Sequence, residues 1–174
     1  MNAKRRLFLI PIILVGCILM IFRYIQVNQH VTNAGVKQEI IIQKNQLIHA
    51  SNVNFKVEKY ALVPHGNDFQ AKITVQLTKT GVSNYGFKKN NDFFTDNMWV
   101  DCPYLGNIPT VSNDSNIARL KKEIENFAQG QTISTNLLFN IPTEMMHAKH
   151  NKLYFVFLVP QANQYEKYLL LLDH

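Results

Sequence analysis

The sequence predicts a mainly β domain, a two-sheet antiparallel sandwich with one short helix, preceded by an apolar N-terminal helix. An uncharged apolar run occupies residues 7–22. Further along, about seven short segments have the patterning of strands, and turn-forming residues separate most of them. Many short strands with turns between them are typical of a sandwich. A barrel is the main alternative.

The apolar run is long enough to cross a membrane. Extended to residue 25 it contains 19 residues, and about 17 to 25 residues span the hydrocarbon core. The basic cluster Lys4-Arg5-Arg6 precedes it, and such clusters stay on the cytoplasmic side. The sequence therefore predicts three parts: a cytoplasmic stub and transmembrane anchor over residues 1–26, a tether over 27–35, and an extracytoplasmic domain over 36–174.

Two alternatives to an uncleaved anchor remain open. The stretch Leu14-Val15-Gly16-Cys17 resembles the bacterial lipobox, which would make Cys17 a lipidation site. A lipidated cysteine is normally followed by a polar tether, whereas residues 18–22 are apolar. The other alternative, a cleaved signal peptide, would need an A-x-A-like cleavage site just after the apolar run, and the sequence has none there. All three readings place the domain outside the cytoplasm.

The positive charge is concentrated at the N-terminus. The chain has 18 basic and 12 acidic residues, a net charge of +6. Four of the basic residues, Lys4, Arg5, Arg6 and Arg23, lie in the first 26 residues. The other 14 stand against all 12 acidic residues, a net of only +2. The basicity thus predicts membrane topology and no nucleic-acid partner.

Alternation of apolar and polar residues predicts the strands. It is cleanest in FQAKITVQL, residues 69–77, and in residues 133–141, so Ile73 and Phe139 should point between the sheets. The other strands are expected at 36–42, 53–62, 152–159 and 165–172, with a weaker one at 93–100. Residues 152–159 are apolar on both faces, as in a central strand.

One helix is expected after residue 114. Leu120, Ile124 and Phe127 recur at helical spacing together with Ile117, and charged residues fill the other face. Asp114 or Ser115 would cap its start, and Gly130 follows its end. We expect this helix to pack across an open edge or end of the sheets.

A resemblance to a known group rests on four stretches. They are VNFKVEKYAL, FQAKITVQLTKTG, GQTISTNLLFNIP, and KLYFVFLVP followed by YEKYLLLLD. Their order resembles the immunoglobulin-like extracytoplasmic domains of Gram-positive lipoproteins and membrane-anchored proteins, akin to a secreted mycobacterial immunoprotective antigen. Most members have no assigned activity, so the resemblance implies an immunoglobulin-like fold and a location outside the cell membrane.

No motif in the chain indicates catalysis or metal binding. Asp92, Asp96 and Asp101 do not have the spacing of a calcium loop. His147 and His150 fall in an expected loop, where a solvated role is favoured. Cys102, the second of two cysteines, precedes a proline and is expected to be packed and inert. The sequence predicts a protein that is not an enzyme, with no cofactor and no metal.

Aromatic residues gather in residues 81–104. Six occur there, and aromatics among glycine and asparagine are typical of recognition surfaces. The predicted binding patch contains Tyr85, Phe93, Phe94, Trp99 and Tyr104. Since Phe93 and Phe94 are adjacent, at most one should fill the core. In the alternative interpretation several of these rings cap the core beneath a long connection.

These observations predict a membrane-anchored, non-catalytic module that binds a protein, a peptide or an envelope component. The alternative is a membrane-associated immunity or regulatory partner that acts through its transmembrane helix.

Overall fold

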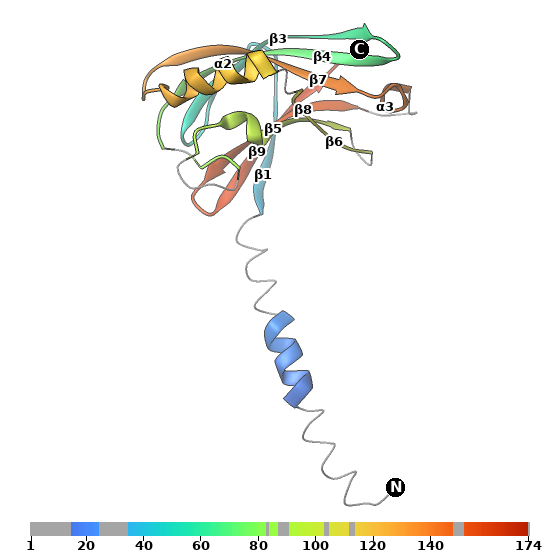
Figure 1. Cartoon of the computed structure of the whole chain (residues 1–174). Helices are drawn as coiled ribbons and strands as arrows, with labels where there is room; N and C mark the ends of the chain where they lie inside the picture. Colours follow the sequence, from blue (N-terminus) through green and yellow to red (C-terminus); the bar gives the residue numbers. More distant parts are fainter. Residues whose placement is uncertain are drawn as a thin grey trace, which may run out of the picture. The chain divides into compact units, whose positions relative to one another are not determined.

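The computed structural model describes residues 15–24, 35–82, 84–86, 91–102, 105–111, 114–147 and 152–173. The chain divides into two compact units, Met1–Gly35 and Val36–His174. In the second unit two β-sheets face each other as layers (Figure 1).

The first sheet has five strands in the order β1-β9-β8-β5-β6. Its strands are β1 (Val36–Ile42), β5 (Met98–Cys102), β6 (Gly106–Pro109), β8 (Leu153–Gln161) and β9 (Gln164–Leu172). The second sheet has four strands in the order β2-β3-β4-β7. They are β2 (Ile48–His49), β3 (Val53–His65), β4 (Asp68–Lys79) and β7 (Thr132–Ile141).

Alternating side chains explain why the long strands form and how they face. In β4 the exposed fractions of Ile73, Val75 and Leu77 are all 0%, while Lys72 is exposed. β3 pairs with β4 through a turn at Gly66, whose φ of +64° suits a residue without Cβ. β7 pairs along β4 from Phe69 to Thr78. The two clean alternating segments are therefore neighbours in one sheet.

The core lies between the sheets and is rich in aromatic side chains. Ile73 and Phe139 are fully buried, as the sequence predicts. The Phe55 ring lies edge-on to Phe157, with centroids 5.0 Å apart, and joins the two sheets. Phe139 and Phe155 make a second edge-on pair at 6.2 Å. Such pairs add about 0.5 to 1.5 kcal/mol beyond the area they bury.

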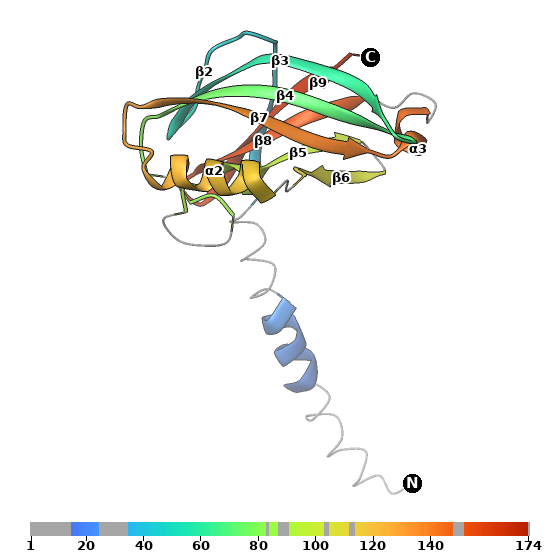
Figure 2. The same ribbon diagram turned by 45° about the horizontal axis from the view of Figure 1, so that its top comes forward.

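The predicted helix is α2 (Asp114–Glu125), and it runs beside β7 between the two layers (Figure 2). Its apolar face joins the core, because Leu120 and Ile124, followed by Phe127 after its end, are buried in the main hydrophobic cluster. Gly130 has a φ of +84° and donates its N–H to the carbonyl of Lys79. The helix thus covers a side of the sandwich as expected.

Strand direction and length differ from the prediction in specific places. β1 pairs with β9 in parallel, so the sandwich is not wholly antiparallel. These strands lie near opposite ends of the domain sequence, and the intervening chain supplies the crossover that parallel pairing requires. The strand expected at 93–100 begins only at Met98, after the 3₁₀ turn η1 (Phe94–Asn97). The short helix α3 (Thr143–His147) and strands β2 and β6 were not predicted.

In the N-terminal unit residues 15–24 are helical, and Cys17 is exposed. The rest of the predicted anchor lies outside the described residues. Among those described, no helix has both the length and the apolar character needed to span a membrane.

Candidate functional site

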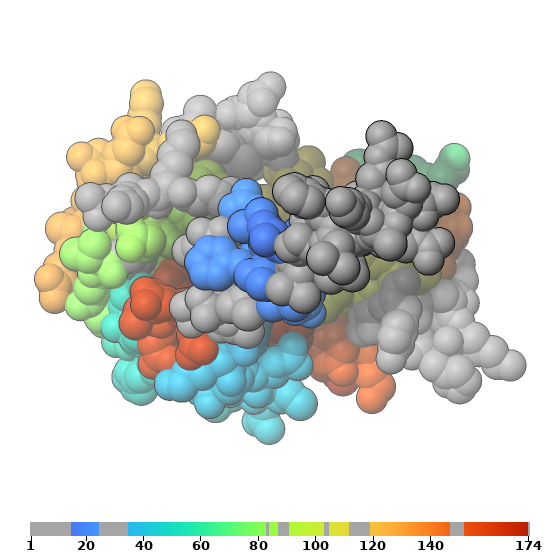
Figure 3. Space-filling view, turned by 90° about the horizontal axis from the view of Figure 1, so that it is seen from below, coloured from blue at the N-terminus to red at the C-terminus, as the bar shows by residue number. Residues whose placement is uncertain are grey.

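An open pocket of about 1210 Å³ lies beside η1, with walls from β5, β6 and α2. In Figure 3 the green atoms of the chain around η1 border the orange-yellow atoms of α2 and the turn after it. The pocket is therefore lined by parts of the chain that are separate in sequence: η1 with β5, then β6, and α2.

The apolar part of the lining has both buried and partly exposed side chains. Met98 and Ile124 are buried, Phe93 and Trp99 are half-buried, and Pro109 is exposed. Aromatic side chains that keep part of their surface open offer large apolar contact area at little entropic cost. The pocket thus presents two rings to whatever enters it.

The polar part of the lining is rich in acceptors. Asp96, Asn107 and Glu125 are exposed there, and Thr110 is half-buried. Lys121 from α2 supplies a cation, whose Nζ lies 5.6 Å from the centroid of the Phe93 ring. An ammonium at this distance is attracted to the ring face.

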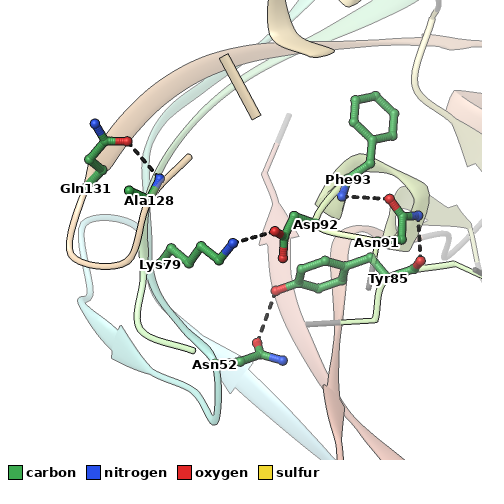
Figure 4. A network of polar contacts seen from close by, with 8 residues as sticks. All are labelled: Asn52, Lys79, Tyr85, Asn91, Asp92, Phe93, Ala128 and Gln131. Carbon is green, nitrogen blue, oxygen red and sulfur yellow. Dashed lines mark hydrogen bonds and ion pairs between the residues drawn. The ribbon is translucent and has the colours of Figure 1, made fainter. Parts of the chain in front are cut away.

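Side-chain amides brace the chain around η1 (Figure 4). The amide of Asn91 donates to the carbonyl of Tyr85 (2.7 Å) and to Asp96 Oδ2 (3.1 Å). Its Oδ1 accepts the Phe93 N–H at 3.0 Å. Asn97 Oδ1 accepts the Gly86 N–H at 2.8 Å, and its amide donates to the carbonyl of Leu158 in β8. The wall that carries Phe93 is therefore fixed before any ligand arrives.

Asp92 and Asp101, two of the three aspartates considered for calcium, lie near lysines. Asp92 pairs with Lys79 of β4, and Asp101 Oδ2 lies 3.8 Å from Lys167 Nζ. Asp96 accepts from Asn91. Within the described residues no three His, Cys, Asp or Glu side chains group as metal ligands would. The predicted pair His147 and His150 cannot be compared with the structure, because only the backbone of His147 is described and His150 lies outside the described residues.

The structure divides the predicted aromatic patch. Phe93 and Trp99 both line the pocket and are partly exposed. Tyr85 and Phe94 do not belong to a surface patch, because only 2% and 1% of their surfaces are exposed. Tyr104 lies outside the described residues.

Tyr85 is a core residue because it closes the space between the sheets. Its ring stacks on Phe157 with centroids 5.8 Å apart, and its hydroxyl donates to Asn52 Oδ1 at 3.2 Å. In Figure 4 the Phe93 ring points away from Tyr85. For Tyr85 and Phe94 the core-capping interpretation is therefore right.

Trp99 faces away from the core. Its neighbours Met98 and Val100 point inward with 2% and 0% exposed, so alternation turns the indole to the outer face of the sheet. The register places it between Pro109 of β6 and Val156 of β8. Its Nε1 is shielded from solvent and has no hydrogen-bond partner within the described structure. An unpaired buried donor costs roughly 1 to 3 kcal/mol.

Lys121, Glu125 and Asn107 were not identified as site residues from the sequence. The two helix residues belong to the charged face of an amphipathic pattern, and Asn107 lies in a short strand without visible alternation. Only their proximity to Phe93 and Trp99 in space distinguishes them.

Cys102 is packed in the core with 0% of its surface exposed. Burial raises the pKa of its thiol, and the neighbouring Asp101 carboxylate raises it further. A thiol that stays protonated is a poor nucleophile.

No protein-family model matches the chain, and no curated protein matches it in sequence. Among solved structures, the chain is similar to an uncharacterized β-sandwich protein from Clostridium difficile 630. The two are 7% identical, with a TM-score of 0.48 over 79% of this chain and 96% of the other.

Proposed function

We propose that this protein is a membrane-anchored, non-catalytic binding module whose domain lies outside the cytoplasm and binds its ligand in the pocket beside η1. The observation that carries the proposal is the pair Phe93 and Trp99, which are half-buried in a pocket with fixed walls. Proteins commonly place recognition residues on loops that a rigid scaffold positions; Phe93 lies on such a connection before η1, and Trp99 lies on the adjoining strand β5. Here the scaffold is the sandwich.

Binding is favoured over catalysis by the state of the polar groups. Asp92 is neutralised by Lys79 and Asp96 accepts a hydrogen bond from Asn91. The thiol of Cys102 is buried with a raised pKa. These groups are held by partners within the fold, so the pocket mainly offers surface for contact with a ligand.

The order of the strands supports an immunoglobulin-like assignment within this proposal. Immunoglobulin domains pack a sheet containing strands A, B and E against one containing G, F, C and C′. Here β3-β4-β7 corresponds to A-B-E, and β9-β8-β5-β6 corresponds to G-F-C-C′. α2 stands in the connection between C′ and E, where such domains have strand D.

The extracytoplasmic location rests on the charge pattern at the N-terminus. The cluster Lys4-Arg5-Arg6 precedes the uncharged residues 7–22, and this asymmetry orients an anchor with its C-terminal side outward. Occupancy of the pocket must therefore be tested in intact cells.

Two variants, each with a single exposed cysteine, test location and binding together. In a Cys17→Ser background, Asn107→Cys places a thiol in the pocket lining, and His65→Cys places one at an exposed position on β3 as a matched control. Cys102 contributes no background because it is buried. A membrane-impermeant maleimide is applied to intact protoplasts and, separately, to the purified full-length protein.

We expect His65→Cys to react equally fast in both preparations, and Asn107→Cys to react more slowly in cells because its ligand covers it. Equal rates at Asn107→Cys would contradict the binding pocket. Protection of both thiols until the cells are permeabilised would contradict the location.

A further inference from the structure

We propose, building on the function proposed above, that the pocket beside η1 accepts an uncharged oligosaccharide. The inference deepens that function by naming a ligand class, and it stands on the charges, rings and size of the pocket.

The charges of the lining disfavour an ionic ligand of either sign. Lys121 already lies over the Phe93 ring, so a cationic ligand would meet a like charge where it would otherwise stack. Asp96 and Glu125 are exposed in the same lining and would repel an anion. With Asp92 paired to Lys79, the exposed carboxylates of Asp96 and Glu125 against the ammonium of Lys121 leave a net charge of only −1, with both signs present in the lining. A neutral ligand fits this balance.

The remaining groups match the chemistry of sugar rings. A sugar ring has an apolar face of C–H groups and a rim of hydroxyls that both donate and accept hydrogen bonds. Phe93 and Trp99 offer apolar surface to the face. Asp96, Asn107 and Glu125 offer acceptors to the rim, and the amide of Asn107 also donates.

The Trp99 indole supplies a further reason to expect a ligand with acceptor atoms. Its N–H is shielded from solvent and lacks an acceptor among the described residues. A ligand hydroxyl that accepted this N–H would remove the cost of leaving it unpaired.

The size of the pocket points to a chain of rings. Small-molecule pockets commonly measure about 300 to 1,000 Å³, and this one has about 1210 Å³ and is open to solvent. The bracing by Asn91 and Asn97 lowers the cost of ordering the site on binding. A rigid, long, open site suits an oligosaccharide better than a single sugar.

The test is titration calorimetry on the full-length protein in a detergent without a sugar headgroup, with Trp99 emission as a second readout. The probes are maltotetraose and the tetramer of N-acetylglucosamine, which separate plain from acetamido glycans. Tetralysine and tetraglutamate are the charged controls. Trp99→Ala is compared with Tyr60→Ala, a half-buried aromatic on the other sheet and outside the pocket.

We expect one of the two saccharides to bind, to change Trp99 emission, and to be insensitive to salt because it carries no charge. Trp99→Ala should weaken binding by about thirtyfold or more, and Tyr60→Ala should leave it unchanged. Glu125→Gln removes the charge and keeps one acceptor oxygen, so it should weaken saccharide binding far less than Trp99→Ala does, whereas a cationic ligand would lose most of its affinity. Preference for either charged peptide, or binding of neither saccharide, overturns the inference. If Asn107→Cys is nevertheless protected in cells, the binding function stands with another ligand.

Discussion

Phe93 and Phe94 are adjacent in sequence but lie in different environments. Phe94 opens η1 with 1% of its surface exposed, and Phe93 is half-buried in the pocket lining beneath Lys121. Phe94→Ala should destabilise the domain by about 3 to 5 kcal/mol, because it leaves a cavity in the core. Phe93→Ala should cost much less and should weaken ligand binding instead. Denaturant unfolding of the two variants in parallel measures the difference.

The pair is its own control, since both changes remove the same side chain. Equal losses of stability would mean that Phe93 is also a core residue and would contradict the division described here.

Gly86 is held in the chain around η1 by both its backbone angle and its neighbours. Its φ is +65°, and an added Cβ would lie 3.0 Å from Asp96 Oδ2. Gly66 has nearly the same φ, +64°, with no atom within 4 Å of such a Cβ. Gly86→Ala should therefore destabilise more than Gly66→Ala and also weaken ligand binding. Thermal midpoints and affinities compare them, and equal midpoints would show that Asp96 adds no crowding.

The buried thiol of Cys102 should lower the free energy of unfolding at alkaline pH. Burial raises the pKa of its thiol above the ordinary 9.0. Below that pH the thiol is protonated in folded and unfolded chains alike. Above it the unfolded chain ionises first, so the free energy of unfolding falls as the pH rises. Cys102→Ala should flatten this dependence.

Tyr168 must be considered with Cys102, because burial and a hydrogen bond to Glu166 raise the pKa of its hydroxyl too. Tyr168→Phe is therefore measured alongside. If the free energy of unfolding of Cys102→Ala falls with pH as steeply as that of the unchanged protein, the loss of stability at alkaline pH comes from other groups.

Cys17 distinguishes the uncleaved anchor from a lipoprotein. If residues 1–26 are retained as a membrane helix, Cys17→Ser should stay in the membrane fraction at its original mass. Neither the unchanged protein nor the Cys17→Ser variant should carry a lipid label. Release of the variant into the medium would establish lipidation at Cys17 instead.

Periodicity predicted the parts of the fold in which one face of an element is buried. β4 and β7 alternate over many residues, and the helix that carries Leu120 and Ile124 has a clear apolar face. β2 and β6 have only two and four residues, too few for a pattern. The parallel pairing of β1 with β9 depends on strand direction, which alternation does not encode.

The site could be predicted only in part. Residues 81–104 lack a period, so nothing in the sequence separates the inward rings of Tyr85 and Phe94 from the open rings of Phe93 and Trp99. Lys121 and Glu125 join these rings only through packing of α2 against the sandwich. The sequence did predict one feature of the site: because Phe93 and Phe94 are adjacent in the chain, they were not expected to share an environment.

Fluorescence of Trp99 tests the central claim most directly, because it is the chain's single tryptophan. In the ligand-free full-length protein, a half-buried indole on the pocket wall should be quenched by iodide, though less than in the unfolded chain. Trp99→Ala should shift the unfolding midpoint far less than Phe94→Ala. Blue-shifted emission that iodide does not reach would place Trp99 in the core and contradict the pocket as the binding site.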